Sequence, residues 1–174
     1  MKVFLPFFLL VFTQQTYATV VDSAYNGFTV RTIVEIRASP EDVFNALVYD
    51  VDHWWDADHS YSGDASNFYM EPRANGCFCE QLPGGGSVLH MTVAHINPGK
   101  TLILLGGMGP LQGMGLYGSM TFSLEKKGEN TQLTMNYVVT GYMPGGIQSL
   151  AAPVDQVLAG QVNRLKTFAE TKNK

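Results

Sequence analysis

The sequence has little charge, little cysteine and no long hydrophobic run. Only 15% of the 174 residues are charged, with 11 basic and 15 acidic side chains and a net charge of −4. Because no basic cluster is present, we expect neither nucleic acid nor an anionic membrane surface as a partner. Two cysteines are too few for a disulfide scaffold. Hydrophobic residues make up 45% of the chain, which excludes a disordered chain and is typical of one globular domain at this length.

The motifs of common catalytic and cofactor sites are also missing. The chain has no Walker lysine, no nucleophile elbow and no class A β-lactamase motif. The glycine-rich segment 106–115 does not match a nucleotide-binding loop, because the residues after it indicate a strand and not a helix. We therefore expect no cofactor. The segment is interpreted as a flexible loop at a cavity mouth, where Met108, Leu111 and Met114 can adapt to a hydrophobic ligand.

The longest apolar run lies near the N-terminus and predicts export. Lys2 precedes ten apolar residues at 3–12, and a polar segment then ends with Thr16 and Ala18 at the positions that a signal peptidase reads. Ten residues are too few to cross a bilayer, which needs about 20. We predict a signal peptide at 1–18, cleavage after Ala18, and no integral membrane segment in the mature chain. The mature protein, with a net charge of −5, is then periplasmic or secreted.

The rest of the chain has the pattern of strand, helix, several strands and a long helix. An N-terminal extension at 19–27 precedes an alternating strand at 28–37. Ser39 and Pro40 then begin a helix, as cap and first helical residue. Apolar residues at 147–168 recur every three or four positions, which predicts a long terminal helix. Together these patterns predict an α+β fold with one antiparallel sheet. Its remaining strands are expected at 68–73, 77–82, 88–96, 101–106, 116–125 and 131–142.

This order of elements resembles the START-like (SRPBCC) superfamily, which includes polyketide cyclase-like proteins. The resemblance covers residues 28–171 and is closest to an exported bacterial subgroup of unassigned activity. It implies a helix-grip fold, in which a curved antiparallel sheet wraps around a long C-terminal helix and leaves a hydrophobic cavity between them. The motifs that carry it are Ser39-Pro40-Glu41-Asp42-Val43-Phe44, Trp54-Trp55, 59–63 (HSYSG), 76–80 (GCFCE), 88–90 (VLH), 109–112 (GPLQ) and 141–146 (GYMPGG).

A tryptophan pair stands among acids and histidines. Trp54 and Trp55 are large rings that either line the cavity or belong to the ordinary core. The carboxylates and imidazoles around them are of the types that bind divalent metals. No metal-site spacing organises them, however, and a solvated turn explains the acids equally well, so we expect no metal. These side chains are Asp52, His53, Asp56, Asp58 and His59.

Glu80 and His90 are predicted to meet across a hairpin. If the strands are symmetric about a turn at 83–87, Glu80 faces His90 and Leu82 faces Val88, with about 5 Å between opposite Cβ atoms. The carboxylate then orients the imidazole and raises its pKa, so that the pair can act as a general base on a bound ligand. The simpler interpretation is a structural ion pair that satisfies two half-buried groups.

Cys77 and Cys79 lie two residues apart in an expected strand. Their Cα atoms are then about 6.5–7 Å apart, at the outer edge of disulfide geometry, so a bridge requires strain or a bulge. We interpret them as small buried hydrophobic residues, with a labile redox pair as the alternative.

Three functions fit these patterns. The first is an exported protein that binds a hydrophobic small molecule or lipid between sheet and C-terminal helix. The second is a cyclase-, dehydratase- or hydrolase-like enzyme, in which the Glu80–His90 pair transfers a proton and must point into the cavity. The third is a structural or interaction domain, which would contain no pocket of a few hundred Å³. The candidate ligand-binding residues are Trp54, Trp55, His59, Glu80, His90, Met108, Leu111 and Met114.

Overall fold

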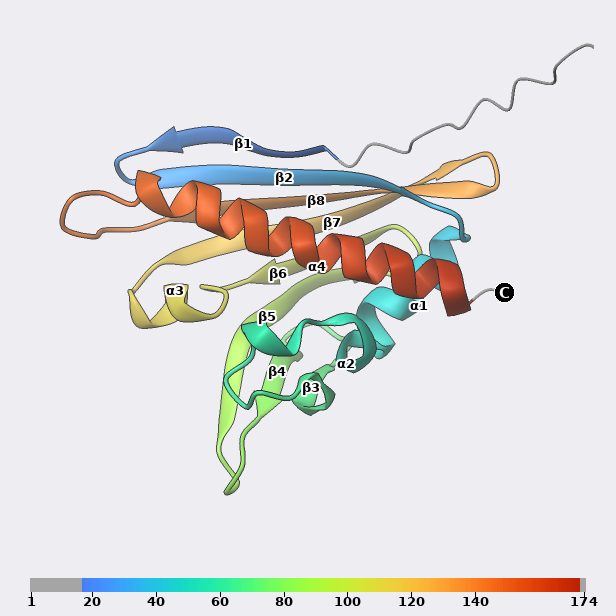
Figure 1. Ribbon diagram of the computed structural model, residues 1–174, viewed down its shortest axis with the longest axis horizontal. Helices are drawn as coiled ribbons and strands as arrows, with labels where there is room; N and C mark the ends of the chain where they lie inside the picture. Colours follow the sequence, from blue (N-terminus) through green and yellow to red (C-terminus); the bar gives the residue numbers. More distant parts are fainter. Residues whose placement is uncertain (1–16, 173–174) are drawn as a thin grey trace, which may run out of the picture.

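A computed structural model of the protein describes residues 17–172, in which a curved antiparallel sheet wraps around one long helix (Figure 1). The spatial order of the eight strands is β1-β2-β8-β7-β6-β5-β4-β3. The predicted α+β helix-grip fold is therefore confirmed. The strands are β1 (Tyr17–Ala24), β2 (Gly27–Ile36), β3 (Phe68–Met70), β4 (Cys77–Gln81), β5 (Ser87–Asn97), β6 (Thr101–Leu105), β7 (Tyr117–Lys127) and β8 (Asn130–Thr140).

The helices begin where the sequence indicates. The Ser39 hydroxyl accepts the Asp42 N–H at 3.2 Å, and Pro40 is the first residue of α1. Pro153 lies in the first turn of α4, where a missing N–H breaks no helical hydrogen bond. None of the helices between residues 17 and 172 is long and apolar enough to cross a bilayer. The helices are α1 (Pro40–Tyr49), α2 (Val51–Trp54), α3 (Pro110–Gly113) and α4 (Ala151–Lys172), with short 3-10 turns η1 (Ala57–His59), η2 (Ala65–Asn67) and η3 (Gln148–Leu150).

The core lies between the concave face of the sheet and α4. Strand β2 alternates, so Val30 and Val34 are buried while Arg31 is exposed. From α4, Leu158 and Leu165 are buried in the same core. Burying one such side chain contributes about 1.5–3 kcal/mol, and this shared apolar layer holds the helix across the sheet.

Strand β1 was not predicted and forms one edge of the sheet. It pairs with β2 from Tyr17 opposite Ile33 to Ala24 opposite Gly27, with a bulge between Val20 and Asp22. The expected N-terminal extension at 19–27 thus contains most of a strand. Residues 1–16 of the predicted signal peptide lie outside the described residues. Cleavage after Ala18 stays a prediction, and it would leave Thr19–Ala24 of the strand.

The hairpin of β4 and β5 departs from the symmetric register that the sequence suggested. Glu80 lies opposite Val88, while Phe78 lies opposite Met91, so His90 is an extra residue in a bulge. The expected pairing of Glu80 with His90 across the ladder is therefore wrong. The reason is a tight turn, in which the Leu82 N–H donates to the Gly86 carbonyl at 2.8 Å, so that Leu82 lies opposite Gly86 and not opposite Val88.

Candidate functional site

A cavity of about 390 Å³ lies between the sheet and the N-terminal half of α4. The sheet contributes β5 and β8, and the sides come from the segment around η1 and from the loop that contains α3. The lining residues are Trp55, Asp58, His59, Ser60, Tyr61, His90, Met108, Gly109, Pro110, Leu111, Met114, Tyr137, Leu150, Pro153, Val154, Val157 and Leu158.

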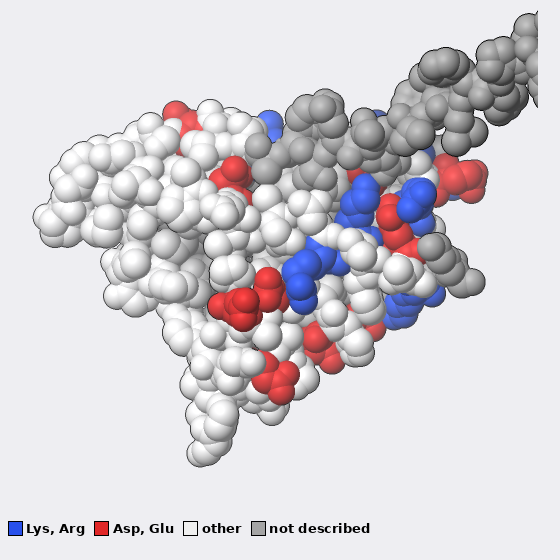
Figure 2. Space-filling model, in the orientation of Figure 1, with Lys and Arg blue, Asp and Glu red and all other residues white. Residues whose placement is uncertain are grey.

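The cavity lies in the part of the molecule that has few charges. Apart from Asp58, the lining contains no acidic side chain, and it contains no Lys or Arg among the described residues. The sequence has no charged residue at 101–124 or at 130–154, and Figure 2 shows a broad uncharged surface at the end where α3 lies. Tyr61 and Met114 are 53% and 44% exposed, so they mark the opening of the cavity. The space therefore suits an uncharged, largely apolar occupant.

The structure brings most of the predicted ligand-binding residues together. Six of the eight line the cavity, namely Trp55, His59, His90, Met108, Leu111 and Met114. Trp54 points elsewhere, because its Nε1–H donates to the Ala46 carbonyl at 2.9 Å and its ring borders a separate surface groove beside α4. Glu80 is fully buried and does not line the cavity itself, but it contacts His90, which does. The role of these residues in binding stays a prediction.

Sequence reasoning missed the wall that α4 supplies. Val154, Val157 and Leu158 line the cavity from the helix, and all three lie on its predicted apolar stripe. That stripe could have indicated them, but helical periodicity does not separate core positions from cavity positions. Tyr137 was also missed, since strand alternation marks it only as an inward residue.

Glu80 and His90 do form a buried pair, although by another route than predicted. His90 Nε2 lies 3.0 Å from Glu80 Oε2, and the two side chains are 2% and 0% exposed. The bulge in β5 interrupts the alternation of inward and outward side chains, so that the adjacent residues His90 and Met91 are both buried. The imidazole can therefore line the cavity without displacing Met91 from the core.

The carboxylate of Glu80 is held by a loop at the cavity rim. It accepts the backbone N–H groups of Tyr61 at 3.1 Å and of Ser62 at 2.5 Å, in addition to its contact with His90. Burial raises the pKa of Glu80, but the hydrogen bonds from Ser62, Tyr61 and His90 together outweigh it and hold the pKa below its ordinary value. Glu80 is therefore ionised at neutral pH.

His90 is neutral at the same pH. Burial lowers its pKa and outweighs the neighbouring carboxylate, so the expectation of a raised pKa is wrong. Nε2 faces the ionised Glu80 and therefore carries the hydrogen, which leaves Nδ1 as an acceptor. Nδ1 is buried and has no hydrogen-bond partner among residues 17–172. The ring stacks on Phe68, with centroids 5.0 Å apart and planes inclined by 19°, so its orientation is fixed.

Tyr137 holds the loop on the opposite side of the cavity. Its hydroxyl donates to the Gly106 carbonyl and accepts the Met108 N–H, both at 3.0 Å. Burial raises the pKa of Tyr137 to about 12, against a smaller opposing effect of the Met108 N–H. The hydroxyl is thus a neutral anchor for the loop that carries α3.

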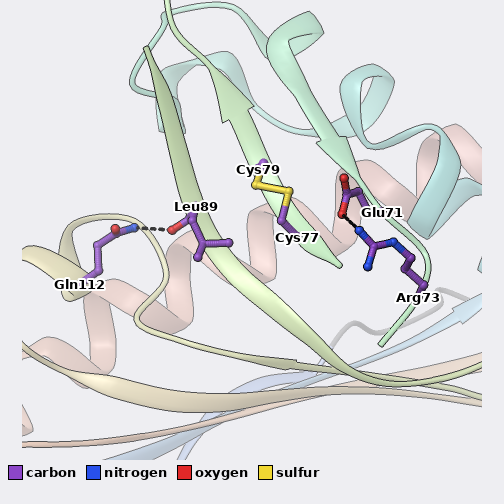
Figure 3. Close-up of a disulfide and its surroundings, with 6 residues drawn as sticks. All are labelled: Glu71, Arg73, Cys77, Cys79, Leu89 and Gln112. Carbon is purple, nitrogen blue, oxygen red and sulfur yellow. Dashed lines mark hydrogen bonds and ion pairs between the residues drawn. A yellow bond between two sulfur atoms is a disulfide. The ribbon is translucent and has the colours of Figure 1, made fainter. Parts of the chain in front are cut away.

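Cys77 and Cys79 form a disulfide, which corrects their interpretation as free buried residues (Figure 3). Their Cα atoms are 5.4 Å apart. The sequence analysis expected such a bridge to require strain or a bulge, and the register of β4 and β5 does shift between Phe78 and Cys79. Figure 3 also shows Gln112 beside Leu89, whose carbonyl accepts the Gln112 Nε2–H at 3.2 Å. This contact attaches the α3 loop to β5 next to His90.

Several of the acids and histidines of 50–59 have local structural partners. Asp52 contacts His53 at 2.8 Å, and Asp56 accepts the Asp58 N–H at 3.2 Å at the start of η1. No group of three metal-ligating side chains occurs within the described part of the chain.

Among the comparisons with known proteins, only those with solved structures give matches, and these matches identify the fold. No family model and no curated protein matches the chain. A conserved protein of unknown function from Enterococcus faecalis, EF2215, is similar in structure, with a TM-score of 0.59, 17% identity, and coverage of 92% of this chain and 80% of that chain. CalU16 from Micromonospora echinospora gives a TM-score of 0.56 and 14% identity over 91% of this chain and 88% of its own.

A third similar structure is DynU16, a protein of the dynemicin biosynthetic locus. Its TM-score is 0.57 at 20% identity, over 83% of this chain and 48% of DynU16. At these identities the likeness shows a shared fold. The protein is therefore a helix-grip domain with an apolar cavity between its sheet and its long helix.

Proposed function

We propose that this protein is an exported binding protein of the START-like type that holds a hydrophobic small molecule or lipid in the cavity. The observation that carries the proposal is the cavity itself, whose volume of about 390 Å³ lies within the range of ligand pockets, roughly 300–1,000 Å³. A structural domain with a filled core would not contain this space. The location of DynU16 in a biosynthetic locus supports a small molecule as the ligand.

The walls of the cavity suit a ligand that varies in shape. Met108 and Met114 are unbranched and polarisable, so they adapt to irregular apolar surfaces. The opposite wall is the more rigid α4, with Val154, Val157 and Leu158. A cavity with one adaptable wall and one rigid wall can bind hydrophobic ligands of different shapes, because few polar side chains in the walls restrict the shape of the ligand.

Native mass spectrometry of the mature protein, purified gently from its own host, tests this proposal. We expect a mass excess that disappears after denaturing extraction, because a hydrophobic guest in this cavity is held without a covalent bond. Val154→Trp should abolish the excess by filling the space, since Val154 lines it. Gln156→Trp is the matched control, as Gln156 is exposed on the same helix. Equal occupancy of the two variants would contradict binding in this cavity. The N-terminal residue of the same preparation tests cleavage after Ala18.

A second candidate function is proton transfer by Glu80 and His90. The arrangement that favours it is a neutral imidazole with one nitrogen held by a carboxylate and the other without a partner. In this function Nδ1 takes a proton from the ligand, and Glu80 stabilises the imidazolium that forms. A cyclase-, dehydratase- or hydrolase-like reaction can begin in this way.

Hydrogen exchange distinguishes catalysis from simple binding. The compound that co-purifies is incubated in deuterium oxide with the wild-type protein or with His90→Gln, and its mass is followed. If the pair removes a carbon-bound proton, the wild-type protein incorporates deuterium and the variant is slower by about 100-fold or more. Equal rates for both proteins would exclude His90 as the base.

A further inference from the structure

The Cys77–Cys79 disulfide lies at the place where the register of β4 and β5 shifts. Cys77 lies opposite Thr92, and Cys79 lies opposite Leu89, so two residue steps on β4 face three on β5. The bridge keeps the Cα atoms of the two cysteines 5.4 Å apart, whereas residues two apart in a regular strand are separated by about 6.5–7 Å. The covalent bond thus shortens β4 at the point where β5 carries its extra residue, His90.

The residues of β4 that contact the imidazole of His90 are both neighbours of Cys79. Phe78 precedes Cys79, and its ring lies against the imidazole with the two centroids 5.5 Å apart. Glu80 follows Cys79, and its Oε2 lies 3.0 Å from His90 Nε2. Phe78 and Glu80 are 2% and 0% exposed, so both are fixed in the core. A change in the path of β4 at Cys79 therefore changes the contacts of His90.

The bridge has little to contribute to global stability. It joins residues that are two positions apart, and the stabilisation that a disulfide gives by restricting the unfolded chain decreases as the closed loop becomes shorter. Its main effect is a local constraint on the native strand.

From these observations we infer that the Cys77–Cys79 disulfide positions the Glu80–His90 pair, and that reduction of the bridge releases His90 from Glu80. Because the pair is then assembled only in oxidised protein, an exported chain would complete this part of the site after it leaves the reducing cytosol. The inference goes beyond the proposed function, since it concerns how the pair is held and not what the cavity binds.

The reduction is an ordinary thiol–disulfide exchange with a dithiol. Cys77 is partly exposed and Cys79 is only 7% exposed, so a thiolate of the reductant attacks the Cys77 sulfur and Cys79 leaves as a thiolate. The second thiol of the reductant then displaces Cys77 from the mixed disulfide. The dithiol becomes a disulfide, and its two electrons and two protons pass to the two cysteines.

A pH titration of the histidine side chains by ¹⁵N NMR tests the inference, on wild-type protein with and without dithiothreitol. In the oxidised protein burial lowers the pKa of His90, so its titration midpoint should lie below 6.5. After reduction the midpoint should rise toward 6.5, because the released ring gains contact with water. His95 is the internal control, since it is exposed on the same strand and its resonances should not change on reduction.

Amide hydrogen exchange gives an independent measurement on Glu80. The backbone N–H groups of Tyr61 and Ser62 donate to its carboxylate. If the carboxylate shifts on reduction, both amides should exchange at least about tenfold faster. The amides of the β2–β8 ladder should keep their rates, because four strands separate β8 from β3 in the sheet and β4 lies next to β3.

The double variant Cys77→Ser/Cys79→Ser should behave as the reduced protein whether or not dithiothreitol is present. Should this variant fail to fold, the two redox states of the wild-type protein decide. If either the His90 midpoint or the exchange of the two amides is the same in both states, the inference is wrong. Unfolding of the whole sheet on reduction would also overturn it, because the expected change is local. Ligand occupancy by native mass spectrometry tests the proposed function separately.

Discussion

His90 Nε2 lies 3.0 Å from Glu80 Oε2, although the two residues do not lie opposite each other in the ladder between β4 and β5. The residue opposite Glu80 is Val88, and His90 is the extra residue of the bulge. Their contact therefore depends on the bulge and on the fixed imidazole ring, and it connects a buried carboxylate to the wall of the cavity.

Acid should destabilise the protein through His90. Its pKa is lowered in the folded state, so below the unfolded value of 6.5 the unfolded chain binds a proton that the native protein does not. Stability is therefore lost as pH falls from about 7 through the lowered pKa. Urea unfolding between pH 8 and 5 measures this slope. His90→Gln should reduce it and His95→Gln, at an exposed position, should not; equal slopes in both variants would contradict the assignment.

Replacement of Glu80 by glutamine should cost about 3 kcal/mol of the free energy of unfolding. The side-chain amide brings two hydrogens into a site where the carboxylate accepts from Tyr61, Ser62 and His90, and a broken buried charged contact costs on this order. Glu125→Gln is the control, because Glu125 is exposed and should change stability by less than about 0.5 kcal/mol. Chemical denaturation of the two variants gives the comparison. A loss below about 1 kcal/mol for Glu80→Gln would contradict a stabilising hydrogen-bond network at this carboxylate.

Tyr137 should lose its hydroxyl proton at a higher pH in the folded protein than in the unfolded chain. Its raised pKa, about 12, means that the unfolded state loses its proton first, near pH 10. Its contribution to stability is thus complete below pH 10 and is lost between about pH 10 and 12. Ultraviolet difference absorbance follows the titration, and Tyr137→Phe should remove the late component. Tyr142→Phe, at a site that is 77% exposed, should leave it in place.

The same Tyr137→Phe substitution should destabilise the native protein at pH 7 by about 1–3 kcal/mol. It leaves the Gly106 carbonyl and the Met108 N–H without their shared partner. Thermal unfolding at neutral pH measures the loss. A stability equal to that of Tyr142→Phe would show that the hydroxyl does not anchor the loop.

The disulfide should resist alkylation until it is reduced. Protein purified without reductant should gain no mass from iodoacetamide, and after reduction it should gain two adducts, at Cys77 and Cys79. The double variant Cys77→Ser/Cys79→Ser should lose only about 1–2 kcal/mol, since the bridge closes a very short loop. Two adducts without reduction would show that the cysteines are free in the native protein.

Local patterns were sufficient for the α+β class, and the resemblance to START-like proteins supplied the helix-grip arrangement. Strand β2 alternates, and Ser39 and Pro40 begin α1 as predicted. The register of the β4–β5 hairpin could not be predicted in this way. The bulge in β5 allows the consecutive residues His90 and Met91 both to be buried. A prediction based on strict alternation of inward and outward side chains cannot describe that arrangement.

The candidate site was only partly predictable for a related reason. Trp54 and Trp55 are adjacent and chemically identical, yet one ring contacts α1 through Ala46 and the other lines the cavity. Which of the two rings lines the cavity depends on tertiary contacts, which no local pattern records. The disulfide was missed because an ideal strand separates its cysteines too widely, and the bulge that changes this geometry lies on the neighbouring strand.

The order of the strands in the sheet also has a consequence for the kinetics of folding. Among the strands described, only β2 and β8 pair across a long stretch of chain, with Gly27 opposite Thr140; every other ladder joins sequence neighbours. Closing so long a loop is slow compared with forming a hairpin. The hairpin that carries Glu80 and His90 can therefore form before the ladder between β2 and β8 closes. The closure of that ladder, and not the formation of the hairpin, is then expected to limit the rate of folding.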